Sequence, residues 1–249
     1  MSVDVGSYDG SIASARGQAR EFVFHRLSQM GDGLAIDEVR KAAAEALEEA
    51  YGVYGDLGAS LAADLYDQIV SLAGKELDPA QPVNEYPDGE PWAYAGYAAS
   101  KELDGDEPDE GAFADMIAAK AAQRVTLAAN RTVEENAGRE RDRAAGIRWA
   151  RVPTSKNPCG FCIVMASRGF VYTSQATAGD GLGPYNSYHD HCTCKAVPGF
   201  EGMQLDGYDE AGYLKQYEAA VGKSGPADID DIAKAIDKAN GRQAHKKKK

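Results

Sequence analysis

The sequence predicts an α+β protein. A mostly helical N-terminal region is followed by a small Cys/His-containing domain with a few short strands, and then by two C-terminal helices. Apolar residues recur at three- and four-residue steps through most of the chain, which is the period of an amphipathic helix. Between residues 147 and 198 that period gives way to short β-branched runs, and all four cysteines lie in the same stretch.

The N-terminal region is predicted to be helical as far as residue 76. Apolar side chains at helical spacing cover residues 11–30, and the glycines that follow end this pattern. A second helix is predicted from Asp37, with a pause at the glycines of 52–58 and a continuation to residue 73. Glycine is a poor helix former, so we expect these residues to interrupt the helix.

The middle of the chain changes composition at residue 77. Prolines and acidic residues predict a linker, with a short helix inside it around 92–103. The longest helical signal then covers 112–146, with Arg124 and Arg131 on its polar side. The predicted modules are a helical region (1–76), the linker (77–111), an α+β domain (112–200), C-terminal helices (201–240) and a disordered basic tail (241–249).

Short elements are predicted after the long helix. Strands are expected at 147–152, 170–173 and 195–198, and a short helix at 163–168. The two C-terminal helices are expected at 209–221 and 227–240. Arginines that alternate with acids predict an ion-paired, solvated face rather than a nucleic-acid stripe; they are Arg139, Arg141, Arg143 and Arg148.

The charge of the chain is −12, although residues 238–249 contribute six positive charges and no negative one. An acidic body repels phosphates, so only the tail is a candidate for DNA contact; its lysines are Lys246, Lys247, Lys248 and Lys249. A solubilising end explains the same residues equally well. No secretion signal or membrane-length apolar run is present, so we expect no membrane partner and reduced thiols.

The cysteines and two histidines form a pattern with metal-ligand spacing. Two residues separate Cys159 from Cys162, the spacing with which two thiolates reach one tetrahedral zinc ion, and His189 and Cys192 repeat it. These four residues are the preferred zinc ligands. Two further candidates are present as alternates, namely His191 and Cys194. The competing interpretation is a set of reduced, buried thiols that pack a small core.

Catalytic interpretations remain open beside the metal site. The Cys-Gly-Phe-Cys sequence before a helix is typical of a thiol redox pair. A protease would use His189 or His191 as the base, and its nucleophile would be Ser167, Ser174 or Ser187. A nucleobase deaminase is excluded, because no His-x-Glu precedes the cysteine pair.

Three sequence motifs together resemble a known family. They are Ala-Asn-Arg-Thr-Val-Glu at 129–134, Ser-Arg-Gly-Phe-Val-Tyr at 167–172 and Tyr-His-Asp-His-Cys-Thr-Cys-Lys-Ala-Val-Pro at 188–198. With the Cys-x2-Cys pair, this order resembles the Mu F-like head morphogenesis family, the minor head proteins of tailed phages, particularly those of actinobacterial phages and prophages. The resemblance covers about residues 112–200. This sequence has Thr193 where the family often has arginine, and its His191 is additional.

The resemblance implies a minor capsid protein that associates with the portal vertex. Such a protein assists procapsid assembly, DNA packaging or delivery, with the portal protein and other head proteins as partners. It would reside in the virion, inside the capsid or at the portal vertex, and in the bacterial cytoplasm during assembly. No established catalytic activity comes with the resemblance, although relatives are often labelled capsid maturation proteases.

Overall fold

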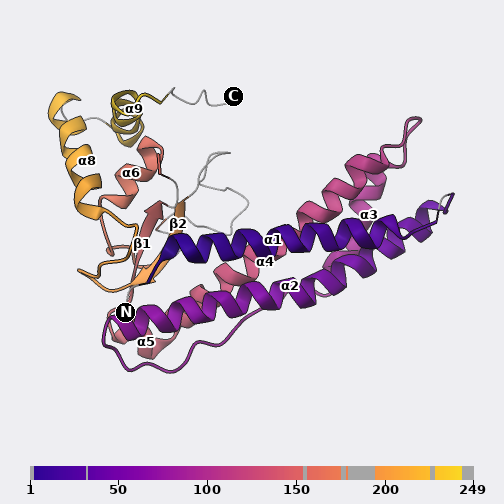
Figure 1. Ribbon diagram of the computed structural model, residues 1–249, viewed down its shortest axis with the longest axis horizontal. Helices are drawn as coiled ribbons and strands as arrows, with labels where there is room; N and C mark the ends of the chain where they lie inside the picture. The colour runs from indigo at the N-terminus through magenta and orange to yellow at the C-terminus, as the bar shows by residue number, and fades with distance from the viewer. Residues whose placement is uncertain are drawn as a thin grey trace. The chain divides into compact units, whose positions relative to one another are not determined.

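The computed structural model describes residues 3–31, 33–153, 156–174, 178, 194–224 and 228–242 (Figure 1). The fold is α+β and mostly helical, as predicted. Its elements are α1 (Val5–Ser28), α2 (Ile36–Leu72), α3 (Glu90–Glu102), α4 (Glu110–Gly138), α5 (Glu140–Ala144), β1 (Arg148–Pro153), α6 (Gly160–Ala166), β2 (Cys194–Gly199), α8 (Glu210–Ser224) and α9 (Ile229–Ala239).

The chain forms two compact units, each assembled from separate stretches of sequence. Unit 1 contains Met1–Ser7, Gln68–Asp78 and Ala137–Lys249, whereas unit 2 contains Tyr8–Asp67 and Pro79–Asn136. These units group residues by contact. The modules predicted above follow composition and motifs instead, and they stay a prediction.

Unit 2 is a helical bundle with a core of small side chains. Alanines from α1, α2, α3 and α4 meet in one cluster, together with larger residues such as Leu47, Tyr51 and Ile117. Alanine keeps helix axes close together and costs little conformational entropy on burial. Helix α1 begins earlier than predicted, because the Asp4 carboxylate caps it by accepting the Gly6 N–H at 2.9 Å.

The predicted pause at 52–58 was wrong, because α2 is continuous through its glycines. Gly55 and Gly58 are places of close approach rather than breaks. A Cβ atom at residue 55 would lie 2.5 Å from the Asn84 Oδ1, and one at residue 58 would lie 2.5 Å from the Val125 carbonyl oxygen. These glycines let α4 and the 79–89 segment approach the backbone of α2.

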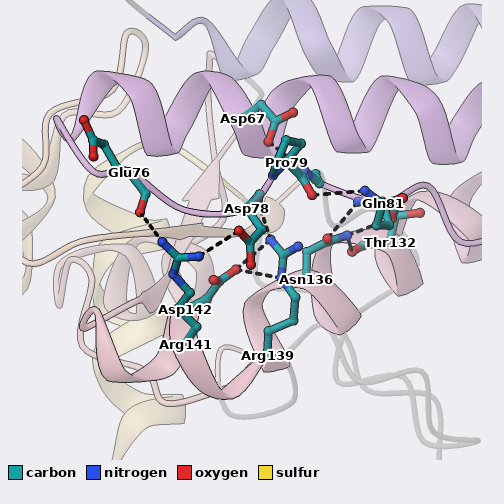
Figure 2. A network of polar contacts seen from close by, with 11 residues as sticks. Asp67, Glu76, Asp78, Pro79, Gln81, Thr132, Asn136, Arg139, Arg141 and Asp142 are labelled. Atoms are coloured by element: carbon teal, nitrogen blue, oxygen red, sulfur yellow. Dashed lines mark hydrogen bonds and ion pairs between the residues drawn. The ribbon is translucent and has the colours of Figure 1, made fainter.

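Polar side chains of α4 hold the 79–89 segment in unit 2. The Thr132 hydroxyl contacts Val83 twice, since it lies 2.8 Å from the amide nitrogen and 3.2 Å from the carbonyl oxygen. The Asn136 amide accepts from the Gln81 N–H at 2.9 Å and donates to the Gln81 carbonyl at 2.9 Å (Figure 2). Both side chains are almost fully buried. They supply the backbone partners that a neighbouring strand would otherwise provide.

Arg124 extends the same polar face of α4 and is only 5% exposed, although the sequence placed it on the solvated side. Its guanidinium donates to the Asn84 Oδ1 at 2.8 Å and to the Glu85 carbonyl at 2.9 Å. The same group lies 5.0 Å from the Tyr86 ring centroid, an arrangement that favours the cation. Burial lowers the pKa of Arg124 from its ordinary value.

The neighbouring Tyr51 belongs to this buried network. Its hydroxyl lies 3.4 Å from the Glu90 carboxylate, which forms an ion pair of 2.8 Å with Lys120. Burial raises the pKa of the Tyr51 hydroxyl, and the charge of Glu90 acts in the same direction. The hydroxyl therefore stays protonated at neutral pH and serves as a donor.

In unit 1, arginines at the start of α5 hold residues 76–78. The helix predicted over 112–146 is divided at Arg139, whose backbone is extended with ψ 139°. The Arg139 guanidinium pairs with the buried Asp142 at 2.8 Å and donates to the Asp78 carbonyl at 2.9 Å. Arg141 pairs with the Asp78 carboxylate at 2.7 Å (Figure 2). Both arginines are ion-paired as predicted, but the face was wrongly predicted to be solvated, because Asp142 is fully buried.

Within the described residues of unit 1, β1 and β2 pair as an antiparallel sheet, in which Trp149 of β1 lies opposite Pro198 of β2. The strand predicted at 170–173 was wrong. Tyr172 makes only an isolated bridge to Trp149, because the Val171 N–H donates to the Gly169 carbonyl at 3.0 Å in a tight turn. Gly169 has φ +67°, a conformation that glycine adopts without strain.

The C-terminal helices pack on α6, as one cluster of apolar side chains shows. Ile163 and Val164 of α6 contact Ala220 of α8 and Ile232 and Ile236 of α9. The C-terminal helices therefore pack against the same short helix that contains Cys162. Among the helices in the described ranges, none is both long enough and apolar enough to cross a membrane.

The close approach at Gly58 yields a stability prediction. In Gly58→Ala the new methyl would meet the Val125 carbonyl, so we expect the free energy of unfolding to fall by about 1–3 kcal/mol. Gly52→Ala is the matched control, because nothing lies within 4 Å of its Cβ position in the same helix. That variant should be stabilised by up to about 1 kcal/mol. Urea unfolding measures both, and a stabilised Gly58→Ala would contradict the close approach.

Candidate functional site: the Cys159–Cys162 turn

The cysteine pair of unit 1 lies at the beginning of α6. Cys159 is the N-cap residue, and its Sγ accepts the N–H of Cys162 with an N to S distance of 3.4 Å. Its carbonyl accepts the Ile163 N–H at 3.0 Å and so begins the helix. Both cysteines are reduced and buried, with exposed fractions of 5% for Cys159 and 1% for Cys162. The turn therefore places both thiols in the same small core.

Helix α9 holds the turn in place through its backbone and a carboxylate. Gly160 packs so closely on α9 that a Cβ atom there would clash with the Ala233 carbonyl oxygen. The Gly160 N–H donates to the Asp237 Oδ1 at 2.8 Å. This bond satisfies an amide at the start of α6 that has no partner within the helix.

Arg242 completes the contact between the end of α9 and the turn. Its guanidinium pairs with Asp237 at 3.4 Å and donates to the Asn157 carbonyl. Composition had grouped this arginine with the basic tail, yet its side chain is only 22% exposed. Through its ion pair and its hydrogen bond, Arg242 therefore connects the residues before Cys159 to the last turn of α9.

Arg151 and Phe161 lie beside the cysteine pair. Arg151 of β1 is fully buried, and its guanidinium carbon is 5.3 Å from the Phe161 ring centroid. Phe161 packs against both cysteines. Arg151 also donates to the Ala178 carbonyl at 3.4 Å. A buried cation on an aromatic face is favoured where water is excluded, so the ring and the arginine position each other.

Two tyrosines complete the other end of α6. Tyr172 donates to the Met165 carbonyl at 3.0 Å, and Tyr208 donates to the Ala166 carbonyl at 2.6 Å. These bonds satisfy carbonyls that the short helix leaves without internal partners. Burial raises the pKa of both hydroxyls, which therefore remain protonated donors.

The described residues contain only part of the predicted metal site. Cys159 and Cys162 lie on one turn, where the Cys162 N–H donates to the Cys159 Sγ, and their spacing in the sequence is the one that zinc thiolates use. His189, His191 and Cys192 lie outside the described residues, and for Cys194 only the backbone in β2 is described. Within the described ranges, no group of three or more metal-ligating side chains gathers. The zinc site stays a prediction.

The described residues do not favour the catalytic alternatives. Thiol exchange requires an accessible sulfur, and both thiols of the turn are buried. Ser167 is buried as a residue, and its hydroxyl donates to the Val164 carbonyl at 2.9 Å, as a structural serine does at a helix end. The Ser174 carbonyl accepts the Ala178 N–H, whereas Ser187 lies outside the described residues.

Sequence reasoning missed the residues that support the turn. Asp237, Arg242 and Arg151 are separated from the cysteines in the sequence, and none belongs to a recognisable motif. One usable signal was the glycine between the cysteines, because a glycine inside a short helix often marks close packing. A glycine at this position indicates that another part of the backbone packs closely on the helix, but it does not indicate which element that is.

A comparison with protein-family models matches residues 3–220 to the model described as VG15 protein. The chain belongs to the VG15 protein family. This is a family of viral proteins. The match to VG15 extends well beyond the motif region of 112–200, since it includes α1 to α4 of the helical units as well as the cysteine turn. No curated protein and no solved structure matches the chain.

The contact between α9 and the turn can be tested at Asp237. In Asp237→Ala, the Gly160 N–H and Arg242 lose their partner, so we expect the free energy of unfolding to fall by about 1–3 kcal/mol. Alkylation of Cys159 and Cys162, followed by peptide mapping, should become faster. Glu218→Ala on the exposed side of α8 is the control. Unchanged alkylation in Asp237→Ala would contradict the support of the turn by α9.

Proposed function

We propose that this VG15 protein is a minor head protein of a tailed phage that associates with the portal vertex. There it assists procapsid assembly, DNA packaging or delivery. The proposal rests on the agreement of two observations. A viral family covers residues 3–220, and within that range the three motifs and the cysteine pair resemble the Mu F-like head morphogenesis proteins.

The described side chains support an assembly role. The motif at 129–134 contains Thr132, which is fully buried and bonded to the backbone of Val83. The motif at 167–172 contains Ser167 and Tyr172, which both bond to backbone carbonyls of α6. These motif residues therefore act as packing and capping groups. That use is expected of a structural protein and requires no reaction.

The basic tail supports a contact with packaged DNA as a further part of the proposal. Lys246, Lys247, Lys248 and Lys249 lie outside the described residues. Their consecutive charges can bind phosphates by releasing counterions, even beside an acidic body.

Attachment to the portal vertex can be tested with assembled particles. We expect the protein to sediment with procapsids that contain the portal protein and to be absent from particles assembled without it. Direct binding to purified portal protein should give the same result. Equal retention in particles with and without portal would contradict the proposal. A chain truncated after residue 245 separates the two parts, since it should keep portal binding and lose only the salt-sensitive DNA contact.

We propose further that the cysteine turn holds a zinc ion with Cys159, Cys162, His189 and Cys192 as ligands. The N–H to sulfur bond of the turn and the burial of both thiols support this set. A zinc ion with these four ligands would connect the cysteine turn to the residues just before β2. It would be a structural site, with no coordination position left open for a reaction. His191 and Cys194 are the alternates.

Metal analysis of the reduced, purified protein tests the zinc ligands. We expect about one zinc ion per chain. Zinc should be lost in the double variant Cys159→Ser, Cys162→Ser, with a lower thermal midpoint, because a structural zinc contributes directly to folding. His191→Ala and Cys194→Ser are matched controls and should retain the metal. A folded, metal-free native protein would remove zinc from the proposal.

A further inference from the structure

An apolar groove lies at one end of the helical unit 2. It has a volume of about 660 Å³, which is within the usual range of roughly 300–1,000 Å³ for ligand-binding sites. Its lining residues come from two places in the chain, namely the α1–α2 turn with the adjoining helix ends and the α3–α4 turn with the start of α4. Figure 1 shows where these two turns lie. Its apolar lining consists of Phe24, Leu27, Met30, Leu34, Ile36, Val39, Leu103, Pro108 and Phe113.

Three of the lining side chains are large apolar residues that are exposed and lie together in the groove. Phe24 is 37% exposed, Leu34 is 38% exposed and Ile36 is 40% exposed. They come from the end of α1, the turn that follows it and the start of α2, so they form one surface rather than scattered contacts with water. Clustered apolar groups of this kind mark interaction sites, because their burial against a partner is favourable.

Acidic residues accompany the groove on the side of the α3–α4 turn, where Glu110 is part of the lining and the other three lie in sequence between the lining residues Leu103 and Pro108. Asp104, Asp106, Glu107 and Glu110 are exposed, and within the described part of the chain none of them forms an ion pair. Other acids of the same unit are neutralised, as Asp115 is by Arg20 at 3.0 Å and Asp37 is by Arg40 at 3.3 Å. The border of the groove therefore carries a local excess of negative charge.

We propose that this groove binds a basic amphipathic helix of a partner protein. Apolar side chains of that helix would fill the groove, and its flanking lysines or arginines would face the four acids. Charge complementarity favours a basic helix over other partners, because an acidic border attracts cations and repels nucleic acid or an anionic membrane. The chain's own lysine tail is a poor occupant, since Lys246 to Lys249 offer no large apolar side chain.

A helix fits the groove better than an extended peptide does. Recognition of an extended strand uses an open sheet edge, and the described residues of unit 2 contain helices and connecting segments but no strand. Helix-in-groove recognition places apolar anchors at positions i, i+3, i+4 and i+7 of the bound helix in a hydrophobic groove. The docking site does not depend on the proposed head function. Its test uses the purified protein and a peptide, so its result stands whether or not the protein binds a portal.

Binding is tested with the full chain and a synthetic peptide of about 18 residues. The peptide carries leucine at i, i+3, i+4 and i+7 positions and lysine or arginine elsewhere, and a fluorescent label reports its anisotropy. One control peptide has the same composition in a scrambled order. A second control keeps the leucine positions and replaces each basic residue with glutamate. We expect saturable binding of the first peptide only, weaker at about 0.5 M NaCl than at about 0.05 M.

Variants of the groove identify the surface that the peptide uses. Leu34→Ser combined with Ile36→Ser should weaken binding by about tenfold or more. The matched control is Val53→Ser combined with Leu57→Ser, because these residues are 57% and 38% exposed on α2 and do not line the groove. Circular dichroism confirms that each variant is folded.

The charged border is tested by a second pair of variants. Neutralising Asp104, Asp106, Glu107 and Glu110 to their amides should weaken binding by about three- to tenfold at low salt and reduce its salt dependence. The matched control removes the same charge from exposed acids elsewhere on unit 2 that do not line the groove, as Glu21→Gln, Glu48→Gln, Asp64→Asn and Asp88→Asn.

Three results would overturn the proposal. Equal binding of the scrambled or acidic peptide would mean that the groove does not recognise a basic helix. Equal loss in the groove variant and in its matched control would place the peptide elsewhere. Self-association of the protein that disappears in Leu34→Ser, Ile36→Ser, without peptide binding by the native chain, would make the groove an interface between two copies.

Discussion

Hydrogen bonds from α4 side chains to the backbone of residues 81–85 are the constraint on which the helical unit depends. Thr132, Asn136 and Arg124 lie on one face of α4, and each bonds to a peptide group or side chain of that irregular segment. A segment without regular structure has amides and carbonyls that need partners when they are buried. The helix supplies these partners, so the segment becomes part of the bundle.

This constraint also gives a physical meaning to the glycines of α2. Because the segment is held against α4, it lies close to α2 as well, and the Asn84 side chain occupies the space beside Gly55 while donating to the Tyr51 carbonyl at 2.8 Å. A larger residue at that position would displace Asn84. The helix propensity lost at glycine is therefore offset by the close packing that it permits.

A similar principle holds the cysteine turn in unit 1, where a helix distant in the sequence supplies the missing partners. The Asp237 carboxylate accepts a hydrogen bond from a backbone N–H at the start of α6. At the other end of the helix, two tyrosine hydroxyls donate to backbone carbonyls. A helix of seven residues has few internal hydrogen bonds. Its stability and the position of both thiols therefore come from α9, Tyr172 and Tyr208.

The sequence by itself determined the helical class, the short helix α3, the strands β1 and β2 and the presence of a cysteine turn. Each depends on local periodicity or spacing, which one stretch of residues carries alone. Only the tertiary structure decided that α2 is continuous, that Arg124 is buried and that Asp237 supports the turn. The reason is that a glycine, an arginine or an aspartate takes its role from neighbours distant in sequence, and local patterns do not contain those neighbours.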